Sequence, residues 1–345
     1  MSETLLRTVG LTRHFRVGKL LSGQTLHAVD DVNLTIGKGE IVALVGESGS
    51  GKSTIARLLA QVYKPTSGEI YFEGQPLSRR RSRKQRLAYS SDVPMVFQDP
   101  YSSINPAYRV AHGIARAIRL HRRGLGRQGR RVEVERVLDA VGLVPPGAAA
   151  RKFPYELSGG QRQRVGFAQA LAFRPKLIIA DEPVSMLDVS IRVGVLNLMS
   201  ELRDREGVSF LYITHDVASA RYIADRVLVM YAGHLVEEGA TEEILQRPKH
   251  PYTQLLLSAV PDPRAPLGVS DTTDVGEPPK VINPKEGCRF RHRCPYAIDI
   301  CETVTPLLRE LGSGRLVACH VAQSDESADE ERIADPRTGV GLERH

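Results

Sequence analysis

The sequence has no tryptophan, no long apolar run and only four cysteines. No apolar stretch approaches the roughly 20 residues that a helix needs to cross a bilayer. The first residues also lack the apolar core of a secretory signal. We therefore expect a cytoplasmic protein that reaches a membrane only through partners. All four cysteines lie between residues 288 and 319, which excludes a disulfide framework spanning the chain.

Length and net charge exclude fewer classes of protein than these absences do. The 345 residues are enough for two domains, or for one large domain with an appendage. The net charge of +7 is compatible with nucleic acid, an anionic membrane face or a nucleotide as ligand. Residues 79–86 carry six basic side chains. They form either a nucleic-acid patch or a solvated segment near the membrane, and the absence of interleaved aromatic residues favours the second reading.

A glycine-rich loop follows the apolar run 41–45 and precedes a helix-like stretch at 55–60. This strand, loop and helix order is the context in which a G-x-x-x-x-G-K-[ST] match binds phosphate. The glycines let backbone N–H groups turn toward phosphate oxygens, Lys52 can reach the outer phosphates, and the Ser53 hydroxyl can ligate Mg²⁺. The motif predicts a nucleoside triphosphate site formed by Gly46, Glu47, Ser48, Gly49, Ser50, Gly51, Lys52, Ser53 and Thr54.

A second anion site is predicted where a helix begins, far along the chain from the first loop. Ser158 is a good N-cap, and the glycines after it leave backbone N–H groups free at the start of a helix that runs to about Phe173. This second element consists of Ser158, Gly159, Gly160 and Gln161.

The apolar run 177–180 predicts a buried strand that ends in two carboxylates. Asp181 would hold Mg²⁺, directly or through water. Glu182 points the other way and is placed to polarise an attacking water. Residues 209–213 predict another strand, with His215 just past its end. Ligands of parallel α/β sheets bind at the carboxyl ends of strands, so His215 is a candidate contact for the terminal phosphate.

The remaining pattern gives a coarse division of the chain. Residues 5–45 alternate apolar and polar positions and predict antiparallel strands. Phe15 is there either to stack on a nucleotide base or to fill the core of its strand. Residues 107–144 predict helix, broken around 124–129, and residues 260–286 predict a linker.

The four cysteines, Cys288, Cys294, Cys301 and Cys319, are separated by five, six and seventeen residues. Four thiolates suit either Zn²⁺ or an iron–sulfur cluster. Structural zinc sites usually have cysteine pairs two to four residues apart, so the longer gaps favour a [4Fe–4S] cluster. Several basic residues between Cys288 and Cys294 would offset the negative charge of such a cluster. We expect its role to be structural.

These motifs occur in the order typical of the ATP-binding cassette (ABC) family. The resemblance implies an α/β fold, a P-loop NTPase cassette with a RecA-like core sheet, an antiparallel β subdomain and a helical subdomain at about 99–172. It also implies that Gln98 is the Q-loop glutamine, which senses Mg²⁺ or the attacking water, and that Asp188 belongs to the D-loop. Met186 departs from the alanine usual in that loop.

A closer resemblance, to the oligopeptide/dipeptide importer ATPases, covers nearly the whole chain. It rests on residues 97–106, 181–185, 250–261 and 287–297, and residues 64–70 are closer to the F-type subunit than to the D-type subunit. It implies a nucleotide-binding domain at 1–247, a small Cys-rich C-terminal domain at 248–320 and a polar, disordered tail at 321–345. Members with this cysteine pattern carry a [4Fe–4S] cluster, which agrees with the spacing argument.

The resemblance also implies a function and a set of partners. The chain would be an ATPase that uses ATP and Mg²⁺ to energise peptide uptake from the cytoplasmic face of the plasma membrane. It would pair head to tail with a second, distinct ABC ATPase subunit and bind two permease subunits, with an extracytoplasmic binding protein delivering the cargo. Nickel or oligosaccharide import is the alternative, and a nucleic-acid-associated ABC ATPase is a remote one. We expect no nucleic-acid partner.

Overall fold

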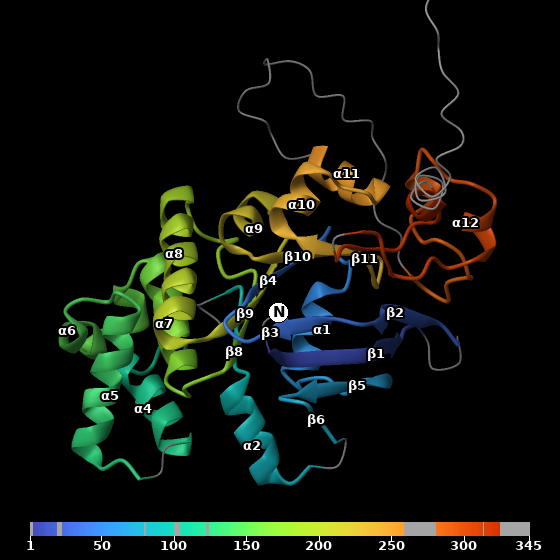
Figure 1. Cartoon of the computed structure of the whole chain (residues 1–345). Helices are drawn as coiled ribbons and strands as arrows, with labels where there is room; N and C mark the ends of the chain where they lie inside the picture. Colours follow the sequence, from blue (N-terminus) through green and yellow to red (C-terminus); the bar gives the residue numbers. More distant parts are fainter. Residues whose placement is uncertain are drawn as a thin grey trace, which may run out of the picture.

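The computed structural model describes residues 3–18, 23–78, 81–99, 104–121, 124–258, 281–312 and 314–324. Two β-sheets pack beside a group of helices, and a small C-terminal region lies near the ends of β2 and β11 (Figure 1). Most of the predicted linker at 260–286 and of the predicted tail at 321–345 falls outside the described residues. Within that tail, residues 321–324 are helical.

The larger sheet carries the strand ends on which the site is built. Its order is β12 (Arg309–Glu310), β13 (Leu316–Val317), β11 (His234–Ala240), β10 (Arg226–Tyr231), β4 (Ile41–Val45), β9 (Ser209–Thr214), β8 (Leu177–Asp181) and β7 (Met95–Val96). The five strands from β10 to β7 are parallel, and β11, β13 and β12 extend the sheet antiparallel. The carboxyl ends of β4, β7, β8 and β9 therefore meet at one edge.

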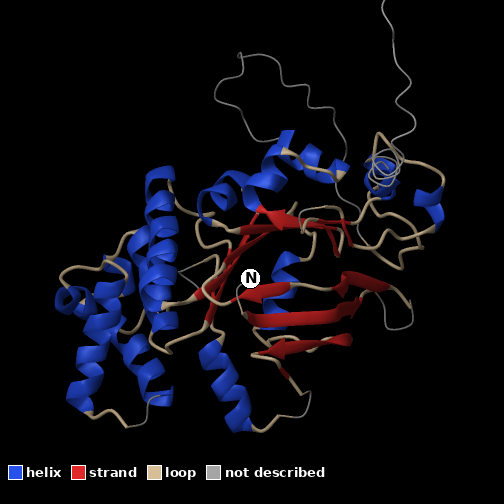
Figure 2. Ribbon diagram, viewed as in Figure 1, coloured by secondary structure: helices blue, strands red, loops and turns tan. Residues whose placement is uncertain are grey.

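The smaller sheet is antiparallel throughout. Its order is β2 (Thr25–Val32), β1 (Thr4–Arg16), β5 (Ser67–Phe72) and β6 (Gln75–Pro76), and β3 (Thr35–Gly37) also pairs with β1. It lies beneath the larger sheet in Figure 2. The alternation of apolar and polar residues over 5–45 fits this arrangement, because one face of an antiparallel sheet can remain near solvent.

Alternate residues of the central strands belong to two different apolar cores. In β4, Ile41 and Val45 pack with the helical side of the molecule, whereas Val42 and Leu44 pack with the antiparallel sheet. Successive side chains of a strand point to opposite faces, so a strand buried on both sides is apolar at every position. This explains why 41–45 and 177–180 are continuous apolar runs.

Helices alternate with the strands along much of the chain. Those before the second anion element are α1 (Lys52–Leu59), α2 (Arg83–Asp92), α4 (Val110–His121), α5 (Arg127–Ala140) and α6 (Pro146–Arg151). Those after it begin with α7 (Gly159–Leu171) and α8 (Val189–Glu206), and continue with α9 (Val217–Ile223), α10 (Thr241–Gln246), α11 (Pro251–Ser258) and α12 (Ile300–Thr303). Among the described residues, no helix is long and apolar enough to span a bilayer.

Three helices form in segments where the sequence pattern does not predict a helix. Part of the basic segment 79–86 forms the start of α2, where Ser82 and Gln85 make a capping box. Pro146 stands at the first turn of α6, where its missing N–H costs nothing. The segment 251–258 folds as α11 and buries Tyr252.

Candidate functional site

The phosphate loop runs from the end of β4 into α1, as the motif predicts. Gly51 has φ of 112°, and a Cβ there would meet the Ala28 carbonyl oxygen at 2.2 Å, so only glycine fits. Lys52 is buried and donates hydrogen bonds from Nζ to the carbonyl oxygens of Gly46 and Glu47, at 2.7 and 2.8 Å. A phosphate in the loop can take the place of these acceptors.

Two opposed effects act on the Lys52 ammonium. Burial lowers the pKa of Lys52, and the nearby carboxylates of Glu182, Asp181 and Glu47 act in the opposite direction. Phosphate oxygens would add negative charge beside the ammonium and favour its charged form.

A pair of oxygen donors suited to Mg²⁺ lies at the start of α1. The Ser53 hydroxyl donates a hydrogen bond to Asp181 Oδ1, at 3.1 Å, so the ends of β4 and β8 bring the two predicted ligands together. Burial raises the pKa of Asp181, against the effects of the Ser53 hydrogen bond and of nearby Arg57 and Lys52. A hydroxyl and a carboxylate are the donors that Mg²⁺ prefers, and the ion's charge would stabilise the ionised carboxylate.

Glu182 stands at the centre of the predicted catalytic group. Gln98 Nε2 donates to Glu182 Oε2 at 3.1 Å, and His215 Nδ1 lies 3.2 Å from Glu182 Oε1. A carboxylate only accepts, so His215 carries its proton on Nδ1 in this contact. Each carboxylate oxygen keeps a second lone pair that can accept a hydrogen from water. The structure thus gathers Gln98, Glu182 and His215, which lie far apart in the chain.

The backbone of Glu182 is itself unusual. Its φ of 47° lies in the left-handed region, and its N–H donates to the Ile213 carbonyl oxygen of β9 at 2.9 Å. A non-glycine residue in this conformation is strained, and such strain persists only where the surroundings enforce it. Here the bond to β9 directs the side chain toward the loop that follows β7.

The second anion element begins α7 as predicted. Ser158 caps the helix, accepting from the Gln161 N–H at 3.3 Å, while Gln161 Oε1 accepts from the Ser158 N–H. A Cβ on Gly160 would meet Ile191 Cγ2 at 2.3 Å, so glycine allows α7 to approach α8. Asp188 is exposed at the start of α8. The hydrogen bonds of the described residues join neither Ser158 nor Asp188 to the phosphate loop.

Phe15 lies near the end of β1 and is half-buried. The Arg13 guanidinium lies 4.5 Å from its ring centroid, and Tyr63 meets the ring edge-on at 5.5 Å. Phe15 is therefore neither a fully buried core residue nor isolated on the surface. Stacking on a base remains a prediction, and it would use ring surface that Arg13 and Tyr63 leave accessible.

The four cysteines lie within the C-terminal region and form no disulfide bond, and Cys301 and Cys319 are buried. Burial raises the pKa of Cys288 to about 11, and the other three cysteines add to the effect. No three of the described cysteine sulfurs lie within 4.8 Å of one another. The four thiols are close enough to influence one another's ionisation, so they form one set of candidate metal ligands.

Comparison with known proteins identifies the family and the fold. The ABC transporter family model matches residues 29–185, and the model for the oligopeptide/dipeptide transporter C-terminal region matches 236–301. A Bacillus subtilis protein named as the oligopeptide transport ATP-binding protein YkfD is 41% identical over 95% of this chain and 98% of its own. The chain belongs to the ABC transporter ATP-binding proteins of the oligopeptide/dipeptide importer family.

Other relatives of this ABC ATPase agree. A Brucella ovis protein named as a peptide import ATP-binding protein is 42% identical over 92% of this chain and 98% of its own. Among solved structures, cbiO1 of Clostridium perfringens matches with a TM-score of 0.63 and 28% identity, covering 71% of this chain and 92% of that one.

A dimer of the cassette MJ0796 in a post-hydrolysis state, bound to ADP and Pi, matches with a TM-score of 0.61 and 28% identity over 69% of this chain and 99% of that one. The predicted cassette fold and ATPase activity are confirmed. The matched C-terminal region contains Cys288, Cys294 and Cys301 but ends before Cys319.

Sequence reasoning missed two residues that hold the phosphate loop of this ABC ATPase. The Tyr252 hydroxyl accepts from the Glu47 N–H at 2.8 Å, and Arg293 donates to both carboxylate oxygens of Glu47 at 2.9 and 3.0 Å. Tyr252 falls in the stretch 250–261 that carries the family resemblance, but the motif itself gives no sign of its contact. The sequence pattern places Arg293 only among the basic residues around the cysteines.

Proposed function

We propose that the chain is the ATP-hydrolysing subunit of an importer whose cargo is peptides, bound to permeases at the cytoplasmic face of the membrane. The names of its relatives support peptides, and two anion-binding elements in one cassette support a shared ATP site. Nickel or oligosaccharides remain alternative cargoes. In this proposal Lys52 and the loop hold the phosphates, Ser53 and Asp181 hold Mg²⁺ with Gln98 nearby, and Glu182 takes a proton from the attacking water.

The ATP site is completed by a second cassette. The hydrogen bonds of the described residues do not join Ser158, at the start of α7, to the phosphate loop of the same chain. In a head-to-tail pair, the phosphate loop of each subunit would instead face the start of α7 of the other subunit. Met186 and Val189, on either side of Asp188, are 64% and 74% exposed. Exposed apolar side chains beside a functional loop fit a surface that a partner covers. The expected partner is a distinct homologous ATPase.

A permease helix docks beside the loop that carries Gln98. A cleft of about 360 Å³ opens there between β7, α4 and α7, and its lining includes Phe97, Asn105 and Tyr108. Phe97 and Tyr108 are 44% and 49% exposed. We infer that residues 101–106, which follow Gln98, form part of this docking surface; of these, residues 101–103 lie outside the described residues. An apolar cleft next to Gln98 allows a permease movement to reach Glu182 through one hydrogen bond.

The four cysteines hold a [4Fe–4S] cluster that stabilises the C-terminal region. A tetrahedral zinc site brings its sulfurs within about 4 Å of one another. No three of the described sulfurs lie within 4.8 Å of one another, and this supports a centre larger than a single ion. Bound metal would favour the thiolate forms that burial opposes. Zinc is the alternative.

Reconstitution tests the transport proposal. The complete complex in lipid vesicles should take up labelled peptide in an ATP-dependent way, and a Lys52→Ala complex should not. If the complex took up nickel or an oligosaccharide but not peptide, the proposed peptide cargo would be wrong. If DNA or RNA stimulated the ATPase activity and the permeases did not, the importer role would be wrong and a nucleic-acid-associated role would take its place.

Metal analysis tests the cluster. After anaerobic purification, the chain should contain iron and inorganic sulfide with a broad visible absorbance, and Cys288→Ser should lose both. Stoichiometric zinc without that absorbance would establish the zinc alternative, and no metal would remove the site.

A further inference from the structure

Two arginines in the loop between Cys288 and Cys294 reach out of the C-terminal region to the nucleotide-binding part. Arg293 donates from Nη1 and Nη2 to the two carboxylate oxygens of Glu47, at 2.9 and 3.0 Å. The side chains are 11% and 26% exposed. The hydrogen bond to Glu47 raises the pKa of Arg293 above its usual range. A bidentate, largely buried pair of this kind fixes geometry as well as charge.

Glu47 is the second residue of the phosphate loop, and its backbone is also held. Its N–H donates to the Tyr252 hydroxyl at 2.8 Å, and its carbonyl oxygen accepts from Lys52 Nζ at 2.8 Å. Two of the groups that fix Glu47, from Tyr252 and Arg293, therefore come from residues beyond 248. The position of the Lys52 ammonium depends on the same peptide.

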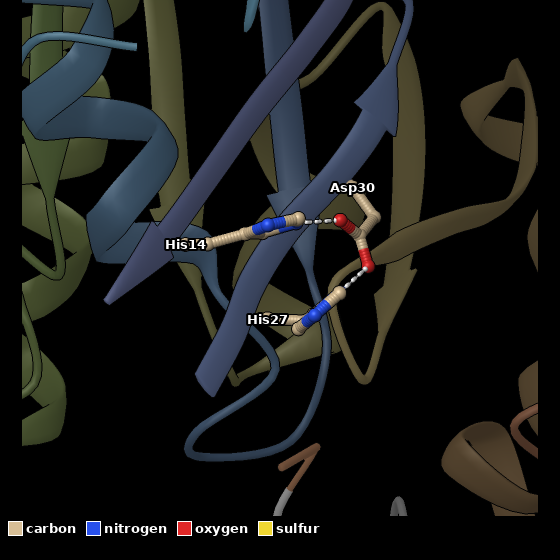
Figure 3. A group of neighbouring side chains, drawn as sticks. All are labelled: His14, His27 and Asp30. Atoms are coloured by element: carbon tan, nitrogen blue, oxygen red, sulfur yellow. Dashed lines mark hydrogen bonds and ion pairs between the residues drawn. The ribbon is translucent and has the colours of Figure 1, made fainter. Parts of the chain in front are cut away.

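Arg289 makes the second contact between the cysteine loop and the nucleotide-binding part, with Asp30. Its guanidinium donates to the Asp30 carboxylate and to the Ala232 carbonyl oxygen. Asp30 is also bonded by His14 from β1 and by His27, whose Nδ1 lies 2.9 Å from Oδ2 (Figure 3). Burial would raise the pKa of Asp30, but the bonds from His14, Arg289 and His27 hold it well below its usual range.

His14 precedes Phe15, the candidate base contact, so the Asp30 cluster lies beside the strand end that would meet the adenine. The Asp30 N–H donates to the Gly233 carbonyl oxygen at 2.9 Å, and the Gly233 N–H donates to the Ser50 carbonyl oxygen at 2.8 Å. Through Asp30 and Gly233, Arg289 is therefore connected by hydrogen bonds to Ser50 of the phosphate loop, and through Asp30 and His14 it is connected to β1.

Ligand atoms of His14, His27 and Asp30 lie within 4.8 Å of one another, which is also the geometry of a metal site. The Arg289 guanidinium already binds the carboxylate, and a divalent ion there would face that positive charge at close range. The contacts favour a hydrogen-bonded cluster that fixes the end of β1.

We propose that Arg289 and Arg293 are positioning residues that couple the cysteine loop to the nucleotide site. Arg293 sets the phosphate loop through Glu47, and Arg289 sets the end of β1 through Asp30. Folding of the cysteine loop thereby raises the affinity for MgATP. This role rests on the proposed ATP site, and the experiment separates the failure of one from the failure of the other.

Equilibrium binding of a fluorescent ATP analogue with Mg²⁺ to the full chain tests the role. Arg293→Gln should weaken binding about tenfold, because a charge-assisted bidentate pair is lost. Arg289→Gln should weaken it less, since Asp30 keeps His14 and His27. Arg291→Gln is the matched control: it lies in the same loop, and its Nη1 donates to the Cys288 carbonyl oxygen. This control should bind as the wild type does.

A double-mutant cycle gives the second readout. Glu47→Gln and Arg293→Gln should each weaken binding, and the double variant should bind no more weakly than either single variant. Arg293→Lys keeps the charge without the fork and should be intermediate, which covers the case in which Arg293→Gln does not fold.

Two results would overturn the inference: binding by Arg293→Gln equal to that of Arg291→Gln, or additive losses in the cycle. Lys52→Ala distinguishes failure of the proposed ATP site from failure of the arginine role. Wild-type binding by Lys52→Ala would mean that the ATP site itself is misplaced. Weak binding by Lys52→Ala with normal binding by Arg293→Gln would remove only the arginine role.

Discussion

Replacing Glu182 with glutamine should stop most ATP turnover while leaving ATP binding intact. The change keeps size and shape but removes the group that can take a proton from water. Glutamine also places an NH₂ group where one carboxylate oxygen accepted from Gln98 at 3.1 Å or from His215 at 3.2 Å. One of those contacts must then break, or His215 must change its protonated nitrogen.

The expected loss follows from the role of a general base. Such a group contributes about 10²–10⁴ in rate, or roughly 3–5 kcal/mol of activation free energy. Binding should not weaken, because the Glu182 carboxylate is one of the charges that act on Lys52, and its removal reduces repulsion with phosphate.

The assay is steady-state ATPase activity of the full complex, paired with nucleotide binding by the same variant. Glu201→Gln is a matched control on the exposed side of α8, where Glu201 meets only Arg205 at 3.9 Å among the ion pairs of the described residues. Near-normal hydrolysis by Glu182→Gln would refute the role of catalytic base. Loss of binding together with turnover would show that Glu182 instead holds the nucleotide.

Further predictions concern Mg²⁺, the second anion element and pH. Ser53→Ala should raise the Mg²⁺ concentration for half-maximal ATPase activity, because it removes the hydroxyl beside Asp181; an unchanged Mg²⁺ titration would exclude Ser53 as a ligand. Ser158→Ala should leave ATP binding by the isolated chain unchanged but lower turnover in the complex by roughly 100-fold, because it removes a hydroxyl that can donate to a phosphate oxygen; normal turnover would refute the composite site. Burial lowers the pKa of His250 to about 3. The unfolded chain therefore binds more protons below about pH 6.5, and stability should fall by about 2 kcal/mol from pH 7 to pH 5. Urea unfolding at both pH values measures this change, and His250→Gln should show a smaller one.

Much of the site could be predicted because each half of it is a local pattern. The phosphate loop needs glycines at fixed positions to turn the backbone, and the strand before it must be apolar at every position because both faces are buried. The same logic located Asp181, Glu182 and His215 at strand ends. The capping box of Ser158 and Gln161 is equally local. Order along the chain was then enough to indicate the family.

Secondary structure near prolines and charges was less predictable from sequence. Pro146 begins α6 although it follows another proline, and the basic segment contributes to α2. Local propensity is a weak guide at such places, because tertiary packing and caps add free energies of the same size. The position of α11 likewise depends on what its Tyr252 contacts.

The sequence by itself determined the phosphate loop, the acidic strand end and the second helix start, since each depends on residues that are neighbours in the chain. Only the tertiary structure decided that Gln98, Glu182 and His215 share one hydrogen-bonded group. It alone also decided that Arg293 binds Glu47 across more than half the chain. The physical reason is that sheet order and the packing of the C-terminal region choose these partners. A single charged side chain on a loop shows no pattern from which its partner could be read.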